Sequence, residues 1–211
     1  GSAELADAFE MIGGGESDFR ASLVLPKALG YHMLATIYAE YENTGDVAME
    51  APLIYVTASQ FSQQTTTHRA FLTLDQSLLT SGFWTSARPE GFSNSVMFLA
   101  SGETPGRLQP GESGRVPIYW AGWQQPWDFT YPPIEFSLYS LPAGNASPIN
   151  LGSYKDAGRP DNLSEEDWNK VWSLYEPHLG STWGDYASVL AGNAYYLGRI
   201  GADPVDVTEP K

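Results

Sequence analysis

The feature that most constrains the fold is a two-residue alternation of side chains between residues 31 and 41. One set of alternate positions holds Tyr31, Met33, Ala35, Ile37, Ala39 and Tyr41, and the other holds His32, Leu34, Thr36, Tyr38 and Glu40. Successive side chains of a β-strand point to opposite faces of a sheet, so this pattern predicts a long strand with one buried face. A chain that contains such a strand needs further strands to pair with it.

Six further short apolar runs supply those strands. They lie at residues 22–25, 52–58, 70–74, 95–100, 115–120 and 134–139, and Gly, Pro, Asn and Asp separate them. About seven short strands with turn residues between them are typical of an antiparallel sandwich of the immunoglobulin type. We therefore predict a mainly β chain whose immunoglobulin-like sandwich covers residues 19–150.

The turn that follows the long strand has the clearest sequence signal of the predicted turns. Asn43-Thr44-Gly45-Asp46 carries turn-forming residues, and Gly45 is free to adopt a positive φ. The turn predicts either a hairpin or a corner between two sheets, leading to the strand at 52–58. Ahead of the sandwich, residues 1–18 are acidic and contain three consecutive glycines, which predicts a flexible arm. Its first two residues, Gly-Ser, are typical of a cloning remnant.

Residues 151–211 change to helical spacing and predict a linker followed by a helical hairpin. Ser164 and Asp167 form a variant capping box ahead of Trp168, Val171, Trp172 and Tyr175, and this helix must end or kink near Pro177. Ser181 or Thr182 caps a second helix, whose stripe is Trp183, Tyr186, Leu190, Ala194 and Leu197. The predicted interface residues of this tail are Trp168, Trp172, Trp183 and Tyr186, which need either the sandwich or a following domain to cover them.

Charge and composition restrict the partners. The chain has 25 acidic and 11 basic residues and a net charge of −14, which repels nucleic acid and anionic lipid surfaces. No apolar stretch reaches the roughly 18 residues that a membrane span requires, so membrane insertion is not expected. Cysteine is absent, which excludes disulfides and thiol chemistry. An acidic, cysteine-free chain rich in Tyr, Trp, Gly and Pro fits the outside of a bacterial cell, so we expect an extracellular or cell-surface location.

The segment 119–131 is the strongest candidate for ligand binding. Trp120, Trp123 and Trp127 lie close in sequence to Asp128, and indole faces next to polar groups suit the binding of a polysaccharide. The alternative is that these aromatic side chains cover one end of the sandwich or support the tail helices.

An acidic cluster at the start of the tail is the candidate metal site. Calcium prefers oxygen ligands, and Asp156, Asp161, Glu165, Glu166 and Asp167 supply them near the first tail helix. The competing explanation is that acidic residues in the first turn of a helix stabilise its dipole. No other cofactor is expected.

Catalysis is not predicted. Asp128 and Glu135 are a candidate carboxylate pair for glycoside hydrolysis, but nothing in the sequence positions them on either side of a bond. His32, His68 and His178 are scattered, and no G-x-S-x-G motif is present.

Two segments resemble known modules. Residues 39–46 with their N-x-G turn, and residues 108–116 with Leu108-Gln109-Pro110-Gly111-Glu112, resemble the turns of CARDB-type immunoglobulin-like modules. Residues 180–201 are similar to a segment that precedes Rhs/YD-repeat shells in very long bacterial surface proteins. The resemblance implies a non-catalytic structural or adhesion-associated module that spaces or presents neighbouring domains, with those domains, a polysaccharide or another surface protein as partners. The alternatives are a carbohydrate-binding module and, more weakly, a glycoside hydrolase.

Overall fold

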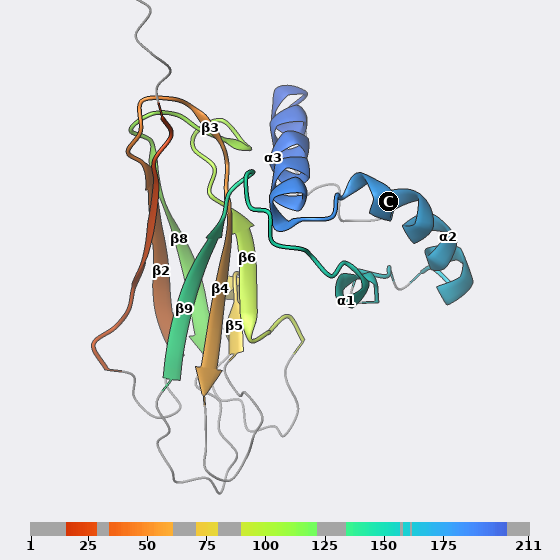
Figure 1. Ribbon diagram of the computed structural model, residues 1–211. Helices are drawn as coiled ribbons and strands as arrows, with labels where there is room; N and C mark the ends of the chain where they lie inside the picture. The colour runs from red at the N-terminus through yellow and green to blue at the C-terminus, as the bar shows by residue number, and fades with distance from the viewer. Residues whose placement is uncertain are drawn as a thin grey trace, which may run out of the picture.

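The computed structural model describes residues 16–28, 34–60, 71–79, 90–121, 134–156, 158–160 and 162–201. The chain is mainly β, with antiparallel sheets and a helical C-terminal region, which confirms the predicted fold class (Figure 1). Within the described residues, none of the helices combines the length and the apolar character that a membrane crossing requires.

Two sheets contain most of the strands. The four-stranded sheet has the order β1 (Phe19–Val24), β2 (Leu34–Asn43), β8 (Ser113–Ala121), β5 (Phe71–Thr73). The three-stranded sheet has the order β6 (Ser95–Leu99), β4 (Leu53–Gln60), β9 (Ile134–Leu141). These seven strands overlap the seven predicted ones. The two-residue strands β3 (Met49–Glu50) and β7 (Arg107–Leu108) form a separate pair that is too short to show an alternating pattern in the sequence.

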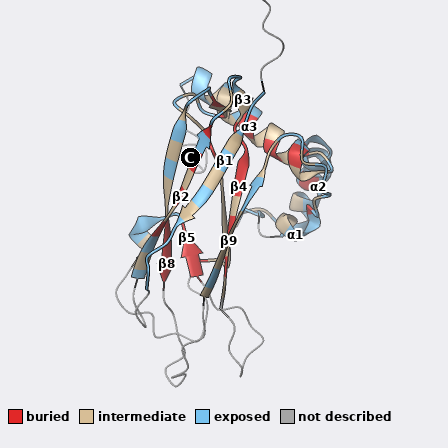
Figure 2. Ribbon diagram, turned by 60° about the vertical axis from the view of Figure 1, so that its left-hand side comes forward, coloured by how far each residue is buried: buried red, intermediate tan, exposed pale blue. Residues whose placement is uncertain are grey.

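The two sheets pack face to face over one hydrophobic core. Ile37 of β2 and Ile118 of β8 are fully buried from one side, and Ile54 and Val56 of β4 are fully buried from the other. Figure 2 shows buried residues along β4, β5 and β8 and in the helical region. Along β2 the buried residues fall on alternate positions, as the sequence pattern predicts, because one face of a half-buried strand must be apolar.

The helical elements follow β9. They are α1 (Gly152–Lys155), α2 (Glu165–Tyr175), the 3₁₀ turn η2 (Glu176–His178) and α3 (Trp183–Arg199). A further 3₁₀ turn, η1 (Gln76–Leu78), follows β5. α3 lies against the sandwich, where it contacts β3, β6 and β9, and α2 lies farther out (Figure 1).

The turn after β2 connects the two sheets. β2 and β4 belong to different sheets, so the turn is an inter-sheet corner and the hairpin alternative is wrong. Gly45 does not have a positive φ, contrary to the prediction. Glycine is needed there for a different reason, because a Cβ would collide with the backbone of Glu16 and Asp18, which cross directly over the turn.

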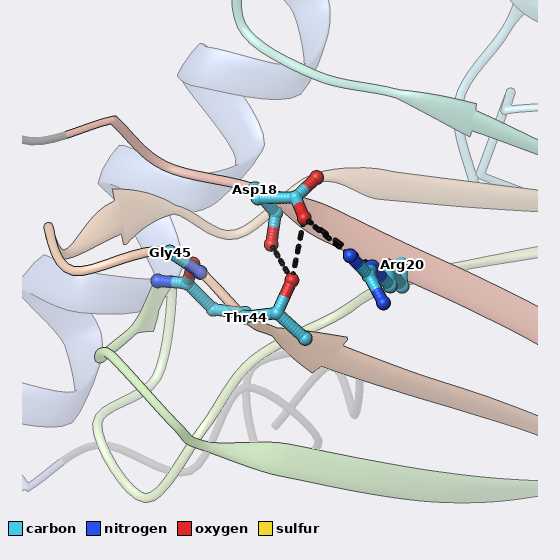
Figure 3. A network of polar contacts seen from close by, with 5 residues as sticks. Asp18, Arg20, Thr44 and Gly45 are labelled. Atoms are coloured by element: carbon cyan, nitrogen blue, oxygen red, sulfur yellow. Dashed lines mark hydrogen bonds and ion pairs between the residues drawn. The ribbon is translucent and has the colours of Figure 1, made fainter.

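A small polar network fixes that crossing (Figure 3). The Thr44 hydroxyl donates to the Asp18 carboxylate at 2.6 Å, and Arg20 donates to the same carboxylate at 3.2 Å. The Thr44 hydrogen bond and then the Arg20 guanidinium lower the pKa of Asp18 below its usual value. The start of β1 is therefore tied to the end of β2 by side chains as well as by the strand ladder.

Asn43 joins the two turns that the sequence analysis singled out. Its side chain is fully buried, and its Nδ2 donates to the carbonyl oxygens of Val47 at 2.9 Å and Leu108 at 3.2 Å. Its backbone N–H donates to Glu112 at 3.0 Å, and its carbonyl accepts from Gly111 at 2.8 Å. Gly111 adopts a φ of 74° in the Pro-Gly-Glu turn, where an L side chain is strained. One buried amide thus organises this end of the sandwich.

Candidate functional site: the docked helical tail

The start of α3 is fixed by a capping box. Thr182 Oγ1 accepts a hydrogen bond from the Asp185 backbone N–H at 3.1 Å, and the Asp185 carboxylate accepts from the Thr182 N–H at 3.0 Å. The Ser181 N–H donates to the same carboxylate at 3.0 Å. The sequence leaves Ser181 and Thr182 as alternative caps, and the structure selects Thr182 because this arrangement satisfies the free N–H groups of the first turn.

Because of the capping box, we expect the stability of the tail to fall at low pH. Hydrogen bonds from Ser181 and Thr182 lower the pKa of Asp185 in the folded state. A carboxyl group with a lowered folded pKa contributes stability above its unfolded pKa of about 4, and that contribution is lost as pH falls through the folded value. We expect Asp185→Asn to melt lower than the native chain at pH 6 and to lose less melting temperature between pH 5 and pH 2. Parallel melting curves across this pH range would contradict the assignment.

α3 approaches the sandwich through Gly184. Its backbone N–H donates to the Asn145 carbonyl at 2.9 Å, and a Cβ at this position would collide with the carbonyl oxygen of Ala143. The preceding residue, Trp183, donates its N–H to the Ser147 carbonyl at 2.9 Å. The chain that follows β9 therefore runs directly beneath the first turn of α3, at a distance only glycine allows.

Two more glycines bring the rest of α3 close to the sheet end. Gly106, with a φ of 74°, lies in the loop before β7, and a Cβ there would collide with the carbonyl oxygen of Ala191 in α3. Near the C-terminus of α3, a Cβ on Gly198 would lie 2.9 Å from Pro105. Arg107 of β7 also places its guanidinium 5.4 Å from the ring centroid of Tyr195. The helix therefore rests on the sandwich along most of its length.

Trp183 is the aromatic centre of this contact. Its ring stacks on Tyr55, on the outer face of β4, with centroids 6.4 Å apart, and meets Tyr154 of α1 edge-on at 6.2 Å. Tyr186, one turn later, contacts Trp183 at 6.2 Å. Tyr55 in turn contacts Tyr139 of β9 at 6.3 Å. Such aromatic pairs contribute about 0.5–1.5 kcal/mol each beyond the burial of their area.

α2 belongs to a second, smaller core. Leu151, Trp172 and Leu179 are buried together, and Trp168, Tyr186 and Val189 pack around them. The Trp168 indole donates to the Lys155 carbonyl at 2.7 Å, which ties α2 to α1. The structure thus brings together all four predicted tail residues, Trp168, Trp172, Trp183 and Tyr186, within two adjoining clusters.

The buried face of α3 differs from the predicted stripe. The residues with the least exposure are Gly184, Ala187 and Ala191, one position on from the predicted Trp183, Tyr186 and Leu190, which are only half-buried. Close approach of a helix to another backbone requires small side chains at the contact, and the large ones then flank it. The series Gly184, Ala187, Ala191 at helical spacing is a signal in the sequence that a search for large apolar residues misses.

α2 also carries three large apolar side chains that stay exposed. Val171, Leu174 and Tyr175 lie at helical spacing, and Leu174 is 75% exposed. Trp168 and Trp172 pack into the second core, and the Tyr175 ring lies at its border, with its centroid 6.3 Å from that of Trp172. An exposed leucine beside two other large apolar side chains is a surface suited to contact with a neighbouring protein.

A groove of about 960 Å³ lies between η2, the start of α3 and the segment before α1. Its polar lining includes Glu176, His178, Ser181, Asp185 and Ser188. The Asp185 carboxylate is already occupied by the capping box. The described residues contain no group of three or more His, Asp or Glu side chains placed to hold a metal ion.

The Trp-rich prediction falls partly within the described structure. Trp120 is 4% exposed and belongs to the sandwich core, so a sugar cannot stack on its ring in this conformation. Trp123, Trp127 and Asp128 lie outside the described residues, and their part in binding a polysaccharide stays a prediction.

The predicted calcium ligands also lie partly inside and partly outside the described residues. Asp167 hydrogen-bonds to the Ser164 hydroxyl at 2.7 Å, and Glu166 pairs with Lys170 at 2.9 Å. Glu165 lies in the first turn of α2, where Ser164 caps the helix, and Asp156 follows α1 on an exposed position. Asp161 lies outside the described residues. The contacts seen are those of a capped helix start, and calcium binding that involves Asp161 stays a prediction.

The described residues do not bring the candidate acid–base residues together. Glu135 is exposed on β9, and its proposed partner Asp128 is outside the described residues. Of the three histidines, His178 lies in η2, while His32 and His68 are also outside that part of the chain.

Comparison with known proteins gives little further information. No protein-family model matches the chain, and a search of curated proteins finds no match. A solved structure of AvmM, which catalyses macrocyclization in alchivemycin A biosynthesis, aligns with 59% of this chain and 89% of its own length, at 13% identity and a TM-score of 0.32. A TM-score at this level supports no inference about activity.

Proposed function

We propose that this chain is a non-catalytic structural module, extracellular or on the cell surface, whose sandwich and helical tail form one rigid unit that holds neighbouring domains in a fixed orientation. The docking of α3 carries the proposal. Gly184 allows α3 to touch the backbone that follows β9, Gly106 lets the loop before β7 touch the backbone of α3, and Gly198 makes room for the Pro105 ring. Trp183 also packs on Tyr55 of the sheet. A flexible linker would not need such contacts.

The surface chemistry of the tail supports a role in contact between domains. The exposed side chains of Val171, Leu174 and Tyr175 on α2 offer an apolar patch to a neighbour. Asn43 hydrogen-bonds to both of the turns that resemble those of CARDB-type modules, so the two turns stabilise each other. The absence of cysteine and the net charge of −14 favour the extracellular location.

Hydrogen exchange of the whole chain tests the rigid unit. If α3 is part of the fold, its central amides, near Ala191, should exchange with a free energy close to that of β2 and β8, because they open only when the sandwich unfolds. Exchange of α3 at a free energy several kcal/mol below that of the strands would contradict a fixed tail. Specific turnover of any substrate across glycan and peptide panels would contradict the non-catalytic part of the proposal.

A further inference from the structure

The outer face of the three-stranded sheet carries aromatic rings next to the tail. Tyr55 of β4 and Tyr139 of β9 are cross-strand partners, and their ring centroids lie 6.3 Å apart. The Trp183 ring of α3 stacks on Tyr55, with centroids 6.4 Å apart. Tyr139 stays 53% exposed, although it belongs to this group of rings. An aromatic ring that is this exposed beside half-buried ones offers an apolar surface to a ligand.

A row of hydroxyl groups lies next to these rings on the same face. The register of the sheet places Thr57 of β4 opposite Ser95 of β6 and opposite Ser137 of β9. Side chains on one face of a strand recur at every second residue, so this row stands directly beside the tyrosine pair. All three hydroxyl residues are half-buried. Glu135, two residues before Ser137, is exposed and adds a carboxylate to the same face.

The polar and aromatic side chains of β9 point away from the core of the sandwich. Ile134, Phe136 and Leu138 pack against that core, so the residues between them face outward. Figure 1 shows α3 beside the end of the sheet at which β9 finishes, whereas β9 begins at the opposite end. The exposure of Glu135 and Tyr139 shows that the tail leaves this part of β9 accessible.

We propose that this strip, formed by Tyr139, Ser137, Thr57 and Glu135, binds an oligosaccharide that carries protonated amino groups. The C–H face of a sugar ring packs on an aromatic ring, and sugar hydroxyls need partners that both donate and accept, which serine and threonine supply. Tyr139 and Glu135 are four residues apart on one strand, about 13 Å, so the strip accommodates more than one sugar.

Charge favours a basic sugar over a neutral or an acidic one. Glu135 is the one charged residue of the strip, and it can pair with an ammonium group. The net charge of the chain, −14, attracts a basic oligosaccharide at long range and repels an acidic one. The strip therefore selects the ring through Tyr139 and the charge through Glu135.

An NMR titration of the native chain with a glucosamine tetramer tests the site, and the N-acetylated tetramer is the ligand that lacks the charge. In mildly acidic buffer the amines are protonated, and about 150 mM NaCl screens the distant charges of the chain. We expect the backbone amide signals of Ser137 and Tyr139 to shift. The glucosamine tetramer should bind up to about fivefold more tightly than the acetylated one, which is the range of one exposed ion pair.

Tyr139→Ala should weaken binding of both tetramers about tenfold, because it removes the ring on which the sugar packs, whereas Tyr139→Phe keeps that ring and should bind normally. Glu135→Gln should abolish only the preference for the glucosamine tetramer. Tyr196→Ala is the matched control, because Tyr196 is 63% exposed on α3 and lies outside the strip. Circular dichroism checks that each variant keeps the native fold.

Absence of saturable binding of either tetramer to the native chain, or equal weakening by Tyr139→Ala and Tyr196→Ala, would overturn the proposal. Equal affinity of the native chain for the two tetramers would overturn the assignment to a basic sugar. The site is independent of the structural role proposed above, because the docking of α3 does not require a ligand on Tyr139.

Discussion

Replacing Asn43 with alanine is expected to lower the free energy of unfolding by about 3 kcal/mol. The side chain is fully buried, and its loss leaves the carbonyl oxygens of Val47 and Leu108 and the N–H of Gly45 without their partner. A buried polar group deprived of its hydrogen bond costs about 1–3 kcal/mol, and little water can enter to replace the amide. Chemical denaturation of the native and variant chains measures the difference.

The matched control is Asn193→Ala, because Asn193 is exposed on α3. That substitution should change stability by less than about 0.5 kcal/mol, as surface changes usually do. Asn43→Asp is a second informative variant, since it keeps the shape but replaces the donating NH₂ group with an oxygen, and it should be at least as damaging as alanine. Near-equal stability of the Asn43 and Asn193 variants would show that the amide does not hold the two turns together.

Much of the sandwich could be predicted because its signals are local. The alternation around Ile37 reports directly which face of β2 is buried, and each of the seven main strands is bounded by turn residues that sequence alone identifies. The partners of those strands could not be predicted. β2 lies between β1 and β8, which are far apart in sequence, and no local signal encodes which strand comes next in a sheet.

Glycine positions show where local reasoning fails. The sequence pattern assigns Gly45 to the turn that contains it, yet this glycine accommodates the crossing of Glu16 and Asp18. Gly184 carries no such local signal, because what makes it necessary is the backbone of Ala143 and Asn145, which are distant in sequence. Gly106 is needed locally for its φ of 74°, but the close approach of Ala191 is equally invisible in the sequence. The sequence predicts that Trp183 must be buried, but it does not predict what buries it. Its partner Tyr55 belongs to β4, and no sequence pattern links the two residues.

The consequence for function is that the tail is tied to the sandwich by sites at which no side chain is tolerated. A linker that merely spans a distance accepts alanine almost anywhere, whereas a helix docked backbone to backbone does not. Two glycines of α3 allow this difference to be tested. A Cβ on Gly184 would meet the backbone that follows β9, whereas a Cβ on Gly192 would meet no atom within 4 Å.

Gly184→Ala is expected to destabilise the chain by about 3 kcal/mol and to free α3 from the sandwich, because the new methyl group would overlap the carbonyl oxygen of Ala143 and the backbone of Asn145. Tryptophan emission should shift to the red as Trp183 leaves Tyr55. In the same helix Gly192→Ala meets no atom within 4 Å and should stabilise by about 0.5–1 kcal/mol through helix propensity alone. Opposite signs for the two substitutions require a docked helix, whereas stabilisation by both would mean that α3 is free and that the tail does not set the orientation of a neighbour.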